Sequence, residues 1–155
     1  MTPSRSRFLS IRGLRYHLRE WGLEGAPKLF MLHGWMDVSA SFQFVVDELA
    51  ADWHVIAPDW RGFGQTEWCS DAYWFPDYLA DLDAILNACS PDEAATLLGH
   101  SLGGQIVPFV DEARRAAARV EKIVTVATGS GYWRENAPEL RRRVWLFWYA
   151  AVPLS

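Results

Sequence analysis

Four short, mostly apolar runs constrain the fold of this chain more than any other feature. Within each run the residues do not alternate between apolar and polar, so both faces of each segment are expected to be buried. Such runs are typical of the central strands of a parallel sheet that helices cover on both sides. The four runs are Leu29–Leu32, Val55–Ala57, Thr96–Leu98 and Ile123–Val126.

Helical patterns lie between these runs. Over residues 42–49 and again over residues 78–89, apolar side chains recur three and four positions apart, which places them on one face of a helix. In the second segment we expect Asp77, Asp81 and Asp83 to lie away from the apolar stripe. The spacing therefore predicts two amphipathic helices, each with one buried face.

A third helix is predicted over about residues 101–119, with a kink or a late start at Pro108, because proline removes a backbone hydrogen bond. Near the N-terminus, Phe8–Arg12 and Leu14–Trp21 flank Gly13 and indicate a hairpin at a sheet edge. After the hairpin, strands and helices alternate. The predicted fold class is α/β, with a mostly parallel sheet and helices on both faces.

Composition excludes several classes of protein. The chain has 155 residues and a net charge of −4, and residues 37–112 hold fourteen acidic residues against one basic residue, Arg61. Such an acidic middle is poorly suited to binding phosphates, so no nucleic-acid partner is expected. The longest apolar run is too short for a membrane span, and two cysteines without metal-ligand neighbours indicate no metal site and no disulfide scaffold. We expect a cytoplasmic protein without a cofactor.

The segment Gly99–Gly104, with the sequence GHSLGG, follows one predicted strand and precedes a predicted helix. This is the context of a nucleophile elbow, in which a serine occupies a sharp turn between strand and helix. Ser101 is the candidate nucleophile, and the backbone N–H of Leu102 can donate to an oxyanion. A phosphate-binding loop is excluded, because Gln105 and Ile106 stand where that motif needs lysine and a hydroxyl residue.

Two further loops follow predicted strands. His33-Gly34-Trp35 ends the first run, and the backbone N–H of Trp35 is a candidate second donor to the oxyanion. We interpret His33 as a residue that shapes this loop by hydrogen bonds rather than as a base. In the loop 59–66, Asp59 and Arg61 lie close to two glycines and predict an ion-paired brace.

Together these motifs resemble the α/β-hydrolase fold superfamily, over roughly residues 13–127. Within it, the chain is similar to serine esterases of the pimeloyl-ester carboxylesterase and meta-cleavage-product hydrolase type. The resemblance implies that Ser101 is the nucleophile and that the amides of Trp35 and Leu102 form the oxyanion hole. It implies that the neighbouring motif residues support the elbow and its loop: Gly99, His100, Gly103, His33 and Gly34. Epoxide hydrolases and haloalkane dehalogenases use aspartate at the elbow, so Ser101 argues against both.

The superfamily pattern also includes an acidic residue and a histidine after the nucleophile. No histidine follows Ser101 here. We therefore predict that residues 1–128 form the N-terminal part of the core and that residues 129–155, including an aromatic helix over 139–152, begin a truncated cap. The expected substrate is a small ester or related acyl compound, hydrolysed weakly or not at all by this chain. The alternative is a non-catalytic fragment or interaction protein, and an exposed sheet edge would favour self-association.

Overall fold

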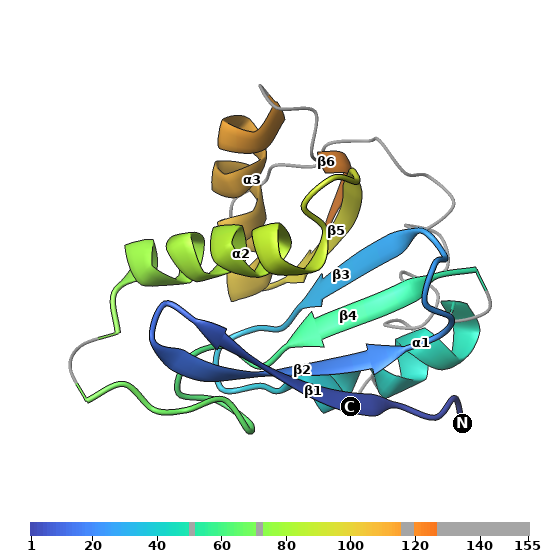
Figure 1. Ribbon diagram of the computed structural model, residues 1–155, viewed down its shortest axis with the longest axis horizontal. Helices are drawn as coiled ribbons and strands as arrows, with labels where there is room; N and C mark the ends of the chain where they lie inside the picture. The colour runs from blue at the N-terminus through green and yellow to red at the C-terminus, as the bar shows by residue number, and fades with distance from the viewer. Residues whose placement is uncertain (50–51, 71–72, 116–119, 127–155) are drawn as a thin grey trace, which may run out of the picture.

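The computed structural model describes residues 1–49, 52–70, 73–115 and 120–126. In this part of the chain one six-stranded sheet has the order β1-β2-β4-β3-β5-β6 (Figure 1). The strands are β1 (Arg5–Ile11), β2 (Leu14–Trp21), β3 (Lys28–Leu32), β4 (His54–Pro58), β5 (Ala95–His100) and β6 (Val120–Val126). The helices are η1 (Ser39–Phe42), α1 (Gln43–Leu49), α2 (Phe75–Cys89) and α3 (Leu102–Arg115).

The sheet is parallel from β4 to β6, and the hairpin β1–β2 joins it antiparallel to β4. Every predicted apolar run lies in one of the four parallel strands. Because parallel strands end at the same edge of a sheet, the loops that follow β3, β4 and β5 meet there. The predicted α/β fold class, with a mostly parallel sheet, is confirmed.

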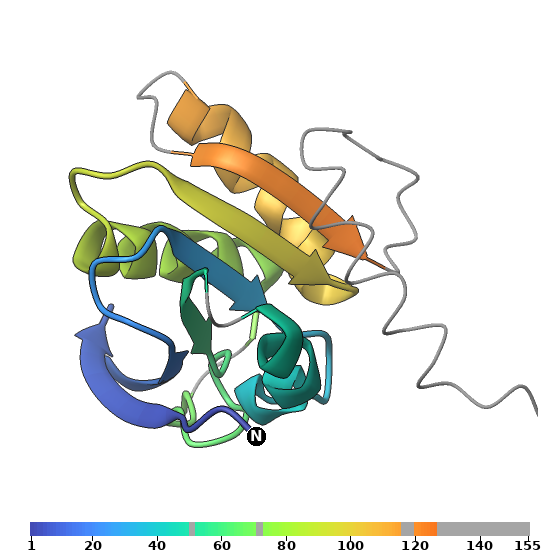
Figure 2. The same ribbon diagram turned by 90° about the vertical axis from the view of Figure 1, so that its right-hand side faces the viewer.

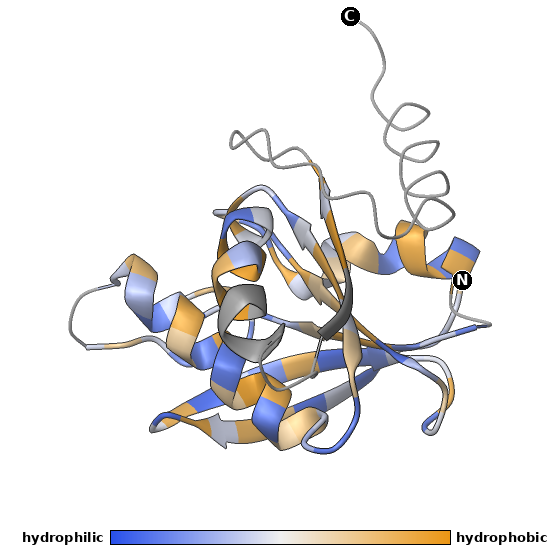
Figure 3. Cartoon of the chain, turned by 90° about the horizontal axis from the view of Figure 1, so that it is seen from above, coloured by the Kyte–Doolittle hydropathy of each residue, from blue (hydrophilic) through white to orange (hydrophobic). Residues whose placement is uncertain are grey.

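Helices cover both faces of this sheet, which explains why its central strands have no polar face. Helix α1 packs on one face around Trp21, Met31 and Val55, whereas α2 and α3 pack on the other around Phe30 and Leu97 (Figure 2). Seen from above, the helices carry both polar and apolar residues, as amphipathic helices do (Figure 3). Two separate apolar cores therefore hold the sheet between them.

The hairpin turn has an unusual backbone. Ile11 pairs with Leu14, and the two residues between them both have positive φ, 47° at Arg12 and 83° at Gly13. A two-residue turn of this kind matches the right-handed twist of the paired strands. Arginine at positive φ is strained, but its guanidinium donates to the carboxylates of Asp77 and Asp81 on α2. The turn is thereby attached to the helix.

One expectation about the helices was wrong, and one of two alternatives for the third helix is excluded. Asp81 does not lie away from the apolar stripe of α2, because its side chain is fully buried and accepts hydrogen bonds from Tyr16 and Arg61. Of the two alternatives expected at Pro108, a kink or a late start, the late start is excluded, because α3 begins at Leu102 and continues through the proline. The apolar residues on both sides of the proline, including Val107 and Val110, are buried against the sheet and α2 and hold the segment in helical form.

The predicted helix end near residue 119 and the whole predicted cap, residues 129–155, lie outside the described residues. Within the described ranges, no helix is long and apolar enough to cross a membrane.

Candidate active site

Ser101 occupies the turn between β5 and α3 with φ of 52°. For a residue other than glycine this left-handed conformation costs roughly 1–2 kcal/mol, so the surroundings must hold it in place. The Ser101 N–H donates to the carbonyl of Val126 on β6 (3.0 Å), and its carbonyl accepts the N–H of Gln105 in α3 (3.1 Å). The serine is thus fixed between the end of the sheet and the first turn of a helix.

The glycines around Ser101 are required by close contacts between backbones. A Cβ atom at Gly99 would lie 2.5 Å from backbone atoms of Gly103 and Gly104. A Cβ atom at Gly103 would overlap the carbonyl of Leu32 at the end of β3. The turn is therefore tight enough to bring α3 directly against β5 and β3, and only glycine fits at either position.

The loop after β3 passes beside the elbow. Leu32 and Gly99 are register partners in neighbouring parallel strands, so the residues that follow them leave the sheet side by side. A Cβ atom at Gly34 would lie 3.1 Å from the Cβ of Ser101 and 3.3 Å from Nδ1 of His100. The loop that carries Trp35 therefore packs against the elbow at Gly34.

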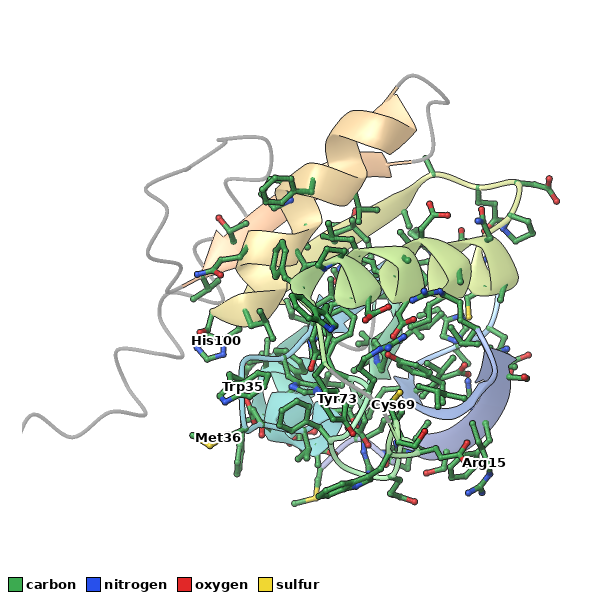
Figure 4. All side chains as sticks on the ribbon, turned by 90° about the vertical axis from the view of Figure 1, so that its left-hand side faces the viewer. Arg15, Trp35, Met36, Cys69, Tyr73 and His100 are labelled. Atoms are coloured by element: carbon green, nitrogen blue, oxygen red, sulfur yellow. The ribbon has the colours of Figure 1, made fainter. Side chains whose placement is uncertain are left out.

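The Trp35 side chain lies at the surface of this edge. The residue is 55% exposed, and its ring packs against that of Phe63 with a centroid separation of 5.1 Å. Figure 4 shows Trp35, Met36 and His100 together at the same side of the molecule. On the other side of the serine, Leu102 is the first residue of α3, where amides have no acceptor within the helix. The two predicted oxyanion donors thus come from two loops at one sheet edge.

His33 is engaged at both ring nitrogens and is fully buried. Its Nε2 accepts the N–H of Trp60 (2.9 Å), so Nδ1 carries the proton and donates to the carbonyl of Gly34 (2.7 Å). Burial lowers the pKa of His33, which keeps the ring neutral. The geometry is that of a residue that shapes the loop, and it leaves no nitrogen free to act as a base.

Asp59 connects the loops after β3 and β4. Its carboxylate accepts the backbone N–H of Ser39 (2.6 Å), the N–H of Gln65 (2.9 Å) and Nδ1 of His17 (2.7 Å). Burial opposes ionisation of Asp59, but these hydrogen bonds outweigh it and its pKa lies below the usual value. Gly64 lies so close that a Cβ atom there would overlap the carboxylate.

Arg61 braces a different part of the structure. It does not pair with Asp59, as an ion-paired loop would suggest, but with Asp81 of α2 through Nε (2.6 Å) and Nη2 (2.7 Å). Tyr16 joins this pair, donating to Asp81 (2.5 Å) and accepting the N–H of Arg61 (3.0 Å). Sequence reasoning missed Asp81, although its position three residues after Tyr78 and four before Ile85 already places it on the buried face.

Two of the remaining histidines, His17 and His54, are paired with residues other than Ser101. His17 bonds to Asp59 and to Ser6, and His54 lies beside Glu20 with Nε2 and Oε2 separated by 3.4 Å. His100 packs against Gly34 and is partly buried, which lowers its pKa despite the opposing charge of Asp37. Across the described ranges, no group of three or more potential metal ligands is brought together.

Strand order, one antiparallel edge hairpin and a serine at a strand-to-helix turn define the class of α/β hydrolases. A family model described as the alpha/beta hydrolase fold matches residues 27–149. The chain belongs to the α/β-hydrolase fold family.

Individual relatives agree with this assignment. A serine hydrolase-like protein of Danio rerio is 34% identical over 88 residues, covering 56% of this chain and 27% of that protein. Epoxide hydrolase A of Mycobacterium tuberculosis is 33% identical over 104 residues, covering 65% of this chain and 32% of that protein. The thioesterase domain from the curacin biosynthetic pathway superposes with a TM-score of 0.77 at 22% identity, covering 97% of this chain and 56% of that domain. The chain thus spans about a third or less of these two curated relatives.

Proposed function

We propose that the protein is a serine hydrolase that acts on carboxylic esters or related acyl compounds, with Ser101 as its nucleophile. The observation that supports this most is the positive φ of Ser101 in a turn where Gly99 and Gly103 admit no side chain. Such strain is retained where a reactive group must project from the end of a sheet.

In the proposed reaction, Ser101 Oγ attacks the carbonyl carbon of the ester while its proton passes to a water molecule, and the leaving alkoxide takes a proton back from water. The developing oxyanion accepts hydrogen bonds from the amides of Trp35 and Leu102. The position of Leu102 at the start of α3 adds the partial positive charge of the helix N-terminus. The alcohol then leaves, and water hydrolyses the acyl-serine.

The serine also bears on the choice among reactions. One relative is named an epoxide hydrolase, but serine stands at position 101, where epoxide hydrolases use aspartate. A hydroxyl nucleophile with two amide donors suits a planar carbonyl that becomes tetrahedral. Ester hydrolysis is therefore the reaction we assign to this site.

Serine needs a proton acceptor to be an effective nucleophile. His17, His33 and His54 have other partners, and the sequence has no histidine after His100. Without such an acceptor, attack by the Ser101 hydroxyl is slow even when two amides stabilise the oxyanion. We therefore expect weak turnover by this chain that still depends on Ser101.

The test is hydrolysis of p-nitrophenyl butyrate by the protein and by its Ser101→Ala variant, with Ser10→Ala as a matched control on an exposed strand. The proposal expects loss of measurable turnover in Ser101→Ala and no change in Ser10→Ala. Mass spectrometry after treatment with a fluorophosphonate should place the label on Ser101. Equal turnover by all three proteins would refute the assignment.

A second candidate function, a non-catalytic interaction protein, is favoured by the engagement of the histidines elsewhere. It expects no hydrolysis above that of heat-denatured protein and no fluorophosphonate label on Ser101. The same measurements therefore separate the two candidates.

A further inference from the structure

A second serine, on the edge hairpin, has the proton acceptor that Ser101 lacks among the described residues. Ser6 lies on β1 with an exposed side chain, and its Oγ is 2.8 Å from Nε2 of His17 on β2. Nδ1 of the same ring is 2.7 Å from Oδ2 of Asp59. Both distances fall within the range that general-base catalysis requires.

The direction of these hydrogen bonds follows from their chemistry. The Asp59 carboxylate accepts two backbone N–H groups besides the histidine, and its pKa is lowered, so it is ionised and can only accept. Nδ1 of His17 must therefore carry the proton. In the neutral ring Nε2 then has a free lone pair, which leaves the Ser6 hydroxyl as the donor.

His17 is held in this orientation from several sides. Its side chain has no exposed surface, and the centroids of the His17 and Phe8 rings are 5.1 Å apart. The backbone N–H of His17 donates to Oγ1 of Thr66. The carbonyl of His17 accepts the N–H of Asp59 (3.0 Å). A base whose orientation is fixed before reaction needs no reorganisation to accept a proton.

A cation lies directly across the hairpin. Ser6 and Arg19 are register partners in the antiparallel pair, so their side chains leave the same face of the sheet. The Arg19 guanidinium donates from Nη1 to Oγ of Ser4, whereas its Nε is buried and has no hydrogen-bond partner within the described ranges. Arg19 thus carries a positive charge on the face of the hairpin from which Ser6 projects.

We propose that Ser6, His17 and Asp59 form a second Ser–His–Asp relay, at which activated carboxylic esters acylate Ser6. Ser6 Oγ forms a bond to the acyl carbon while its proton passes to Nε2 of His17. When the substrate is an aryl ester, the bond from that carbon to the aryl oxygen breaks, and a phenolate leaves. The positive charge of Arg19 on the same face favours the oxyanion that exists between these steps.

The burial of His17 determines what happens next. Deacylation needs a water molecule within reach of Nε2, but the His17 side chain has no exposed surface and acylated Ser6 continues to cover this nitrogen. Acyl-Ser6 therefore accumulates instead of turning over. The relay is a site of covalent modification by acyl donors, distinct from a hydrolytic centre.

The site is also far from the elbow. Strands β1 and β5 are four positions apart in the sheet order, which corresponds to about 19 Å at the usual strand spacing. In Figure 4, Arg15 of the hairpin lies well away from His100. Ser6 and Ser101 can thus be tested independently of each other.

The experiment treats the Ser101→Ala variant of the full chain with p-nitrophenyl acetate and follows each O-acetylated serine by tandem mass spectrometry over time. Ser10 on the same strand and Ser4 just before it are internal controls, because the hydrogen bond to His17 is made by Ser6, whereas Ser4 accepts from Arg19. We expect Ser6 to be acetylated at least ~100-fold faster than either, as general-base catalysis supplies. Acetylation of Ser6 at the rate of Ser10 would overturn the proposal and leave His17 and Asp59 as a loop brace.

Two variants add to this comparison. Ser6→Ala, at an exposed position, should remove the fast acetylation while Ser10 reacts as before. His17→Gln should slow Ser6 to the rate of Ser10, with folding checked by circular dichroism. Because the comparison of Ser6 with Ser10 needs no change at His17, the proposal stays testable even if that variant does not fold.

Discussion

Ser101 and Ser6 represent two ways of presenting a hydroxyl group, and each has what the other lacks. Ser101 has a strained backbone, close glycines and amides for an oxyanion, but no proton acceptor among the described residues. Ser6 lies in relaxed strand geometry and has a histidine and an aspartate behind it. The described part of the molecule therefore has a turn that exposes a serine and a relay that can accept a serine proton, but at two different places.

The two serines also differ in the kind of contact that holds their surroundings together. The elbow depends on backbone-to-backbone packing where β3, β5 and α3 converge, which demands glycine. The hairpin depends on side-chain pairs that reach from β1 and β2 to the loop after β4 and to α2. The hairpin is held by hydrogen bonds and ion pairs, so removing a polar side chain should destabilise it. The elbow should instead be destabilised by adding a side chain to one of its glycines.

The largest effect is expected at Asp81, which connects the hairpin to α2. Asp81→Ala leaves the buried guanidinium of Arg61 and the hydroxyl of Tyr16 without their acceptor. We expect a loss of about 3–5 kcal/mol in the free energy of unfolding, measured by urea titration. Asp83→Ala, on the same helix, is the control, and an equal effect of both would show that the buried network is not what holds the hairpin.

Next in size is a pair of glycine substitutions, one in each region. At Gly103 an alanine Cβ would overlap the backbone of Leu32, and at Gly13 it would meet no atom within 4 Å despite the φ of 83°. Gly13→Ala should cost about 1 kcal/mol from backbone strain alone, and Gly103→Ala should cost more. Thermal unfolding of both variants gives the order, and the reverse order would contradict the packing described for the elbow.

Replacement by glycine should change the free energy of unfolding in opposite directions at the two serines. Ser101→Gly relieves a positive φ of 52° and should stabilise the fold by about 1 kcal/mol. Ser6→Gly removes a side chain from a strand and should destabilise it by roughly 0.5–1 kcal/mol. Chemical denaturation measures both changes. If both variants were stabilised, or neither, the two serines would not differ in backbone strain.

The smallest effect concerns pH. Burial lowers the pKa of His33, so the unfolded chain takes up a proton first as the pH falls. The stability contributed by neutral His33 should be complete above the unfolded pKa of about 6.5 and should be lost as the pH falls towards the folded pKa. His33→Gln should flatten this slope between pH 7 and 5; an unchanged slope would assign it to other groups, such as His100.

The main elements of the fold and of the elbow could be predicted from local patterns. Strands buried on both faces and helices with one apolar face have their periodicity in the sequence, and the glycines of residues 99–104 are adjacent to the serine they accommodate. The partners of Asp59 and Arg61 could not be predicted in this way. A charged residue near a glycine indicates a brace, but nothing local says that Arg61 reaches Asp81, twenty residues further on.

The sequence by itself determined the α/β architecture and the identity of the candidate nucleophile, because both depend on residues close together along the chain. Only the tertiary structure decided that Asp81 is buried, that His33 has no free nitrogen and that Ser6 meets His17. These facts depend on strand pairing and on loops that converge from distant segments. Hydrogen bonds of this kind form only once the sheet has brought their donors and acceptors within about 3 Å of each other.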